Sequence, residues 1–329
     1  MAYASYEYEG RGRVGRVSGD RLVPLAGLTE LGRDTPTEVL ASAANSAEPS
    51  VALADVRLLP VVPNPDKILC VGLNYHSHVG ETGRELPTYP VLFAKFASSL
   101  IGASDDIVLP PESTQVDYEA ELAVVIGRTG RRIPRASALE HVLGYTVAND
   151  VTMRDYQYKT HQWIQGKAWD RSTPLGPYLV PPGEVDLTGA GIRTVLRSPE
   201  TRSSQARQGS DVARGSEVSR GSDVARGSEV SQGSEVLQSS DLSKLIFDIP
   251  KLIATVSEFC TLLPGDVILT GTPGGVGYRR SPQVFLAEGD QITVEIDGVG
   301  RLTNRVRAEH PVAPLAPVPS AAVPATVQS

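Results

Sequence analysis

Hydrophobic and polar residues alternate along several short segments of this chain. The run Gln291–Asp297 alternates with a period of two, which predicts a strand with one face buried. The run Asp117–Gly127 is instead apolar and rich in β-branched residues downstream of Glu121, and Gly144–Asp150 is a second apolar run that ends in an acid, a pattern typical of buried strands. Glycine and proline separate these runs, so the sequence predicts many short strands.

Fewer segments have helical spacing. Pro250–Cys260 places Ile253, Val256 and Cys260 on one face, and Pro36–Asn45 and Ala136–Val142 are further helix candidates. Many strands with a few peripheral helices predict an α+β fold that is mainly β.

Two glutamates interrupt the apolar pattern. Glu119 and Glu121 are one residue apart in the 117–127 strand, so alternation places both carboxylates on the same face. Two such charges repel each other unless a cation or a shared proton holds them, although an edge strand facing water would also accommodate them. Asp150 ends the next buried strand and adds a third carboxylate. Oxygen ligands alone suit Mg²⁺ or Mn²⁺, with Ca²⁺ as an alternative, and disfavour zinc.

Composition excludes several classes of function. The formal net charge of −7 over 329 residues argues against nucleic-acid binding, and we find neither an apolar run of transmembrane length nor a signal peptide. The two cysteines, Cys70 and Cys260, lie in apolar runs, which suits reduced thiols in a cytoplasmic protein. A nucleophilic pair of Cys70 with a nearby histidine is the weaker interpretation, because a cysteine in a buried strand usually serves packing.

The chain divides into three parts with different composition. Residues 1–62 predict a small N-terminal module, 63–308 a catalytic domain, and 309–329 a disordered tail rich in proline and alanine. Within the second part, a six-residue repeat begins at Gly209 with GSDVAR and GSEVSR. One valine per unit cannot build the core of a β-helix, so we interpret residues 199–234 as a low-complexity insert.

Several motifs in order along the chain resemble the fumarylacetoacetate hydrolase superfamily. The resemblance extends from about Asp66 to Val306 and rests on these runs: VGLNY at 71–75 with His78 and Glu81, PVLFAK at 90–95, the 117–127 strand, Asn149-Asp150-Val151, Gly166-Lys167, PLGP at 174–177, and LPGDVILTGTPGGVG at 263–277. It implies a mixed β-sandwich roll with peripheral helices, and a homodimer.

The resemblance also implies roles for individual residues. Glu119, Glu121 and Asp150 match the metal-binding acids of the family. His78 and Glu81 match a dyad that activates water; a short helix would place them on one face, at i and i+3. Lys167 matches a lysine that stabilises negative charge, and Gln157 and Thr272 match residues that contact substrate. Without the resemblance, His78 would read as an ordinary, partly buried histidine.

These residues together predict an enzyme that acts on a small oxo acid. The first interpretation is metal-dependent hydrolysis of a C–C bond in a β-diketo or 2-oxo acid, such as an acylpyruvate. The alternative is an isomerase or decarboxylase of a hydroxymuconate-type dicarboxylate or of oxaloacetate. A non-catalytic scaffold that uses the repeat is a third possibility, and the intact set of polar groups argues against it.

Overall fold

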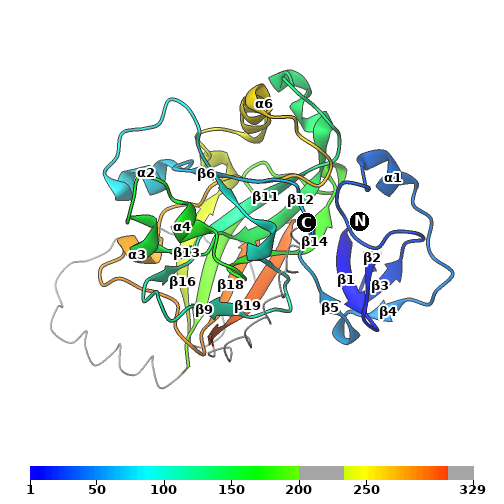
Figure 1. Ribbon diagram of the computed structural model, residues 1–329, viewed down its shortest axis with the longest axis horizontal. Helices are drawn as coiled ribbons and strands as arrows, with labels where there is room; N and C mark the ends of the chain where they lie inside the picture. The colour runs from blue at the N-terminus through cyan, green and yellow to red at the C-terminus, as the bar shows by residue number, and fades with distance from the viewer. Residues whose placement is uncertain (200–232, 310–329) are drawn as a thin grey trace, which may run out of the picture.

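The computed structural model describes residues 1–199 and 233–309. Strands dominate these residues, which confirms the mainly β, α+β fold (Figure 1). The largest sheet runs in the order β4 (Val51–Ala52), β3 (Arg21–Pro24), β2 (Arg11–Ser18), β1 (Tyr3–Tyr8), β14 (Thr173–Val180), β12 (Val142–Asn149), β11 (Ala120–Ile126), β17 (Val267–Leu269), β6 (Ile68–Gly72) and β7 (Val91–Lys95). Outside this order, β5 (Arg57–Leu58) pairs with β1, and β8 (Leu100–Ile101) pairs with β14.

Two smaller sheets complete the strand framework of the described residues. One has the order β16 (Ser234–Asp241), β15 (Gly191–Arg197), β18 (Gln291–Ile296), β19 (Gly300–Ala308) and β9 (Ile107–Leu109). The other pairs β10 (Val116–Asp117) with β13 (Thr152–Met153).

Short helices lie around the sheets. They are α1 (Thr37–Ser42), α2 (His76–Thr82), α3 (Arg154–Gln157), α4 (Ile164–Lys167) and α6 (Ile249–Phe259), with 3-10 helices η1 (Leu53–Asp55), η2 (Ala97–Ser99), η3 (Arg135–His141), η4 (Pro182–Glu184), η5 (Leu242–Lys244) and η6 (Gly277–Arg279). In Figure 1, α2, α3 and α4 lie on the opposite side of the view from β1–β5.

The burial of the central strand β11 explains why most of its residues are apolar. All seven of its residues are buried. Leu122 and Val124 pack into one hydrophobic cluster, whereas Ala123 and Val125 pack into another. Since successive side chains point to opposite faces, both faces of β11 are covered, which accounts for its apolar residues from Leu122 onward; Glu121 is the exception.

The structure adjusts several predicted elements. The expected strand 117–127 is interrupted at Tyr118 and Glu119, between β10 and β11, so Glu119 precedes the strand that contains Glu121. The predicted helix 136–142 is the 3-10 helix η3. The predicted helix 250–260 is confirmed as α6, where Asp248 accepts a hydrogen bond from the backbone N–H of Lys251 as the N-cap.

The expected insert and tail fall largely outside the described residues. The strands that flank the insert, β15 and β16, pair antiparallel with Arg197 opposite Ser234. The segment that joins β15 to β16, which contains the repeat, lies largely outside the described residues. The division into a module of residues 1–62 and a domain of residues 63–308 stays a prediction.

Gly166 allows α3 and α4 to pack closely. A Cβ atom at this position would lie 2.5 Å from both the N and the Cα atoms of Gln157. This contact lies beside Lys167, so the spacing of the two helices determines where Lys167 and Gln157 are held.

We expect Gly166→Ala to lower the free energy of unfolding by about 1–3 kcal/mol, because the added methyl group must push backbone atoms apart. Chemical denaturation would measure the change. Gly183→Ala is the matched control, since its Cβ would meet no atom within 4 Å. Equal stability of the two variants would show that α3 and α4 do not need this close approach.

Candidate functional site

Antiparallel pairing of two buried strands brings the three predicted metal ligands together. Ala120 of β11 lies opposite Asn149 of β12, so the start of one strand meets the end of the other. The backbone N–H of Asp150 donates to the carbonyl of Glu119 at 2.9 Å. Ligand oxygens of Glu119, Glu121 and Asp150 consequently lie within 4.8 Å of one another, and all three side chains are buried.

This clustering of negative charge perturbs the carboxyl groups in opposite directions. Burial, together with the charges of Asp150 and Glu119, raises the pKa of Glu121 well above its ordinary value. Burial also opposes ionisation of Glu119, but Lys167 and Arg154 outweigh it and lower the pKa of Glu119 to about 2. Glu121 is therefore the carboxylate whose charge is least compensated by the protein.

Three buried cations surround the acids. Lys167 Nζ lies 2.7 Å from Glu119 Oε2 and 2.7 Å from Asp150 Oδ2. Lys95 Nζ lies 2.7 Å from Asp150 Oδ1, and Arg154 contacts Glu119 Oε1 at 2.6 Å. Burial disfavours the ammonium of Lys167, yet Asp150 and Glu119 raise its pKa above the ordinary value, so Lys167 stays protonated.

Glu121 is oriented by the backbone instead of by a cation. Its Oε2 accepts a hydrogen bond of 2.7 Å from the N–H of Gly271, and in the described ranges it makes no ion pair. Gly271 has φ of +102°, and a Cβ there would lie 2.7 Å from Asn74 Cβ. Glycine is thus required where the backbone approaches this carboxylate.

The donor set fits a hard divalent cation. Carboxylate oxygens are the ligands that Mg²⁺ and Mn²⁺ prefer, and the under-compensated charge of Glu121 would be neutralised by such an ion. Glu119, Glu121 and Asp150 are the residues that would hold it.

His78 and Glu81 lie on one face of α2, as the i, i+3 spacing predicts. His78 Nδ1 is 2.6 Å from Glu81 Oε1, and Glu81 Oε2 accepts from the N–H of Gly275 at 2.7 Å. An ionised carboxylate only accepts hydrogen bonds, so Glu81 keeps a hydrogen on Nδ1 and leaves Nε2 as the basic nitrogen.

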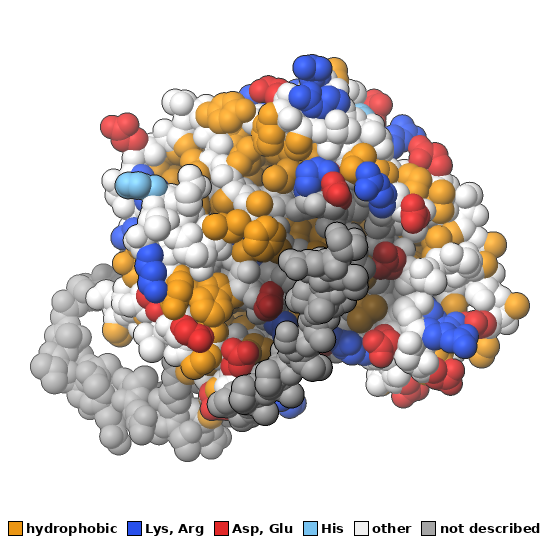
Figure 2. Space-filling view, viewed as in Figure 1, with side chains coloured by type: hydrophobic (Ala, Val, Ile, Leu, Met, Phe, Trp, Pro, Cys, Tyr) orange, Lys and Arg blue, Asp and Glu red, His pale blue; other side chains and the backbone are white. Residues whose placement is uncertain are grey.

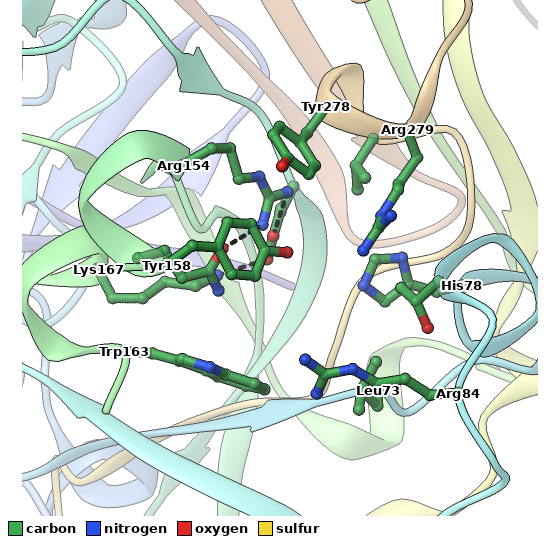
Figure 3. A pocket seen from close by; sticks show the side chains of 13 residues that line it. Leu73, His78, Arg84, Arg154, Tyr158, Trp163, Lys167, Tyr278 and Arg279 are labelled. Carbon is green, nitrogen blue, oxygen red and sulfur yellow. Dashed lines mark hydrogen bonds and ion pairs between the residues drawn. The ribbon is translucent and has the colours of Figure 1, made fainter. Parts of the chain in front are cut away.

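A narrow cavity of about 30 Å³ joins these groups (Figure 3). Predicted site residues line it from three directions: His78 from α2, Gln157 and Lys167 from α3 and α4, and Glu119 from the strand side. Four residues predicted from the sequence therefore line one cavity, and one of them, Glu119, also belongs to the acid cluster.

Thr272 lies outside this cavity and is held by a neighbouring side chain. It does not line this cavity, and its hydroxyl accepts a hydrogen bond of 2.8 Å from Gln238 Nε2. Gln238 also accepts from the N–H of Ala120 at 3.0 Å, so it connects β16, β11 and the loop after β17. A contact between Thr272 and substrate stays a prediction.

Sequence reasoning missed several members of the site. Arg154 Nε binds Asp117 Oδ2 at 2.8 Å, and Arg154 Nη1 donates to Gln157 Oε1 at 2.9 Å. Its position four residues after Asp150 and three before Gln157 was the available signal. The other missed cavity-lining residues are Leu73, Thr82, Arg84, Tyr158, Trp163, Val276, Tyr278 and Arg279.

The surroundings of Cys70 do not support its alternative role as a nucleophile. The side chain of Cys70 is fully buried in β6, and burial raises the pKa of its thiol well above the ordinary value. A buried, protonated thiol serves packing and is a poor nucleophile.

Surface and membrane features complete the description. In Figure 2, Lys and Arg side chains are interspersed with Asp and Glu over the visible face, with hydrophobic side chains between them. Among the helices of residues 1–199 and 233–309, none is long and apolar enough to cross a membrane.

Known proteins resemble the chain in both sequence and structure. A mitochondrial oxaloacetate tautomerase of Xenopus laevis is 39% identical over 267 residues, which cover 80% of this chain and 73% of that protein. A human mitochondrial oxaloacetate tautomerase is 38% identical over 260 residues, covering 78% and 72% of the two chains.

Solved structures of related enzymes are similar to this chain in fold and in sequence. A 5-carboxymethyl-2-hydroxymuconate delta-isomerase from Mycobacterium smegmatis superposes with a TM-score of 0.71 at 32% identity, covering 94% of this chain and all (100%) of that one. The fumarylacetoacetate hydrolase of Exiguobacterium antarcticum gives 0.70 at 31% identity, with coverages of 94% and 100%. The family model described as fumarylacetoacetate (FAA) hydrolase C-terminal matches residues 67–307, so the chain belongs to the fumarylacetoacetate hydrolase family.

Proposed function

We propose that this protein is a divalent-metal-dependent tautomerase of a short 2-oxo dicarboxylic acid, with oxaloacetate as the first substrate to test. The sequence alone favours hydrolysis of a C–C bond. The names of the relatives, which include oxaloacetate tautomerases and a hydroxymuconate isomerase, favour the alternative reading instead.

The observation that carries the proposal is the arrangement of base and cation around one cavity. The His78–Glu81 dyad lies on one wall, and the protonated Lys167, fixed between Glu119 and Asp150, lies on another. Keto–enol exchange needs a base for a carbon-bound proton and a positive charge for the oxygen that becomes negative.

The proton transfer follows from these positions. His78 Nε2 removes a proton from C3 of the substrate; the C–H electron pair forms the C2–C3 double bond, and the carbonyl pair moves to oxygen. Lys167 stabilises that negative oxygen, which then takes a proton from water to give the enol, while the imidazolium of His78 returns its proton to the solvent and becomes neutral again. Glu81 stabilises the imidazolium that His78 becomes in between. A divalent ion held by Glu119, Glu121 and Asp150 would add Lewis-acid stabilisation of the oxyanion.

Hydrolysis is the second candidate, because the same dyad could deprotonate water. The two reactions differ in outcome: tautomerisation conserves the carbon skeleton, whereas hydrolysis divides it. A single assay therefore separates them.

We expect the purified protein to accelerate enol–keto exchange of oxaloacetate in the presence of Mg²⁺, followed by the loss of enol absorbance. Removal of the metal with a chelator should abolish the acceleration, and added Mg²⁺ or Mn²⁺ should restore it. Acetylpyruvate is tested in parallel, with its products separated by chromatography. If the protein cleaved acetylpyruvate but did not accelerate the enol–keto exchange of oxaloacetate, it would be a hydrolase and the tautomerase proposal would be wrong.

Metal binding is expected to stabilise the fold independently of turnover. An ion that binds only the folded state adds about 2.7 kcal/mol when its concentration is 100 times its dissociation constant. We expect Mg²⁺ to raise the temperature of thermal unfolding, and Glu121→Gln to remove most of this rise.

The metal-free variant gives a second readout. Since the pKa of Glu121 is raised, its ionised form destabilises the metal-free fold at neutral pH, so Glu121→Gln without metal should unfold at or above the wild-type temperature. Glu112→Gln, at an exposed acid, is the control and should keep the full response to Mg²⁺. If Mg²⁺ raised the unfolding temperature of Glu121→Gln as much as that of the wild type, Glu121 would not be a metal ligand.

Loss of the proposed base should slow the proton transfer. His78→Gln is expected to lower kcat about 10²- to 10⁴-fold while leaving the Mg²⁺-induced stabilisation in place. His161→Gln, which changes an exposed histidine outside the cavity, should behave as wild type. If His78→Gln retained full exchange activity, another group would have to move the proton.

The other expectations remain at the level of prediction. A homodimer follows from the family resemblance, and its test is the mass in solution. The cytoplasmic location is a sequence-based prediction, whereas the tautomerases named above are described as mitochondrial.

A further inference from the structure

The mouth of the cavity carries two arginines that the proposed chemistry does not use. Arg84 follows α2 and Arg279 ends η6, and both line the cavity. Figure 3 shows the two side chains reaching toward the cavity from the side of His78, across from Arg154 and Lys167. They come from segments almost 200 residues apart, so the fold itself brings them together.

These two arginines differ from the buried cations in what they contact. Arg154 and Lys167 bind carboxylates directly. Arg84 instead lies over the ring of Trp163, 5.9 Å from its centroid, and Arg279 lies 5.3 Å from the ring centroid of Tyr278. Neither has an ion pair with a carboxylate in the part of the chain that the structure describes. Aromatic neighbours orient a guanidinium without neutralising it.

Charge compensation of the acid cluster does not require Arg84 or Arg279. The four buried carboxylates of the inner cluster, those of Asp117, Glu119, Glu121 and Asp150, already face the three buried cations Lys95, Arg154 and Lys167. A divalent ion on the acid triad would make this inner cluster positive. The positive charge at the mouth is therefore available for an anion from outside.

We propose that Arg84 and Arg279 bind the distal carboxylate of the substrate and so make the enzyme selective for dicarboxylic 2-oxo acids. This inference rests on the proposed function, in which the 2-oxo acid end lies at the acid triad and Lys167. A substrate oriented in this way directs its far end toward the mouth. A carboxylate there pairs with guanidinium groups through charge-assisted hydrogen bonds, whereas the neutral acyl end of an acylpyruvate has no such partner.

The alternative without a binding role is that both side chains are solvated surface arginines, since both residues are exposed. A solvated arginine would not distinguish a charged from a neutral substrate end. A pair of matched substrates therefore decides between the two interpretations.

The experiment compares oxaloacetate with its C4 methyl ester, which keeps the reacting 2-oxo acid end and loses the distal charge. We expect Arg84→Met and Arg279→Met each to lower the ratio of kcat/KM for the acid to kcat/KM for the ester about 10- to 100-fold, mostly through KM for the acid. Arg301→Met, at an exposed arginine on β19 away from the cavity, is the control and should keep the wild-type ratio. An unchanged ratio in both variants would overturn the proposal while leaving the tautomerase assignment intact.

A binding measurement separates the two hypotheses if neither substrate is turned over. Malate and its C4 amide share a 2-hydroxy acid end that cannot enolise, and calorimetric titration with Mg²⁺ present compares their affinities. Tighter binding of malate in the wild type, lost in Arg84→Met and Arg279→Met, would support the arginine site even if the proposed reaction is wrong. Equal binding of malate and the amide by the wild type would overturn the arginine site.

Discussion

The structure depends on the placement of three carboxylates inside a hydrophobic protein. Burying Glu119, Glu121 and Asp150 together is unfavourable, because each loses hydration and repels the others. The fold offsets this cost with Lys95, Lys167 and Arg154, and with the N–H of Gly271. The remaining imbalance, concentrated on Glu121, is what makes the site receptive to a divalent ion.

The strands and the short helices determine how the buried acids lie relative to the groups that are proposed to act on substrate. Glu121 lies on β11, Glu119 directly before β11 and Asp150 directly after β12, and both strands are fully buried. The groups proposed to act on substrate come from the short helices α2, α3 and α4, which lie over that end of the strands (Figure 1). Excluding water around the cavity strengthens each charge interaction, so a lysine and a histidine at its walls have larger effects than they would in water.

The arrangement also suggests how one inner site can serve several reactions within a family. In the proposed function the acid triad, Lys167 and the His78–Glu81 dyad act on the 2-oxo acid end, which a hydrolase, an isomerase and a tautomerase would share. Differences in substrate then belong to the mouth, where Arg84, Tyr158 and Arg279 lie. On this proposal, a change of side chain there would alter which acid binds without disturbing the charge balance of the buried acids.

The sequence by itself determined the strand-rich fold, α6, and the three acids that cluster, Glu119, Glu121 and Asp150. Periodicity identifies β11 and β12 because burial on both faces leaves a continuous apolar run, and acids within such runs stand out. The tertiary structure alone decided which cations neutralise those acids, that η3 is a 3-10 helix, and that Thr272 binds Gln238. It also decided that Arg84 and Arg279 share one mouth. The physical reason is that local patterns report which side chains face the core, whereas pairing between charges distant in sequence depends on how strands and loops meet in space.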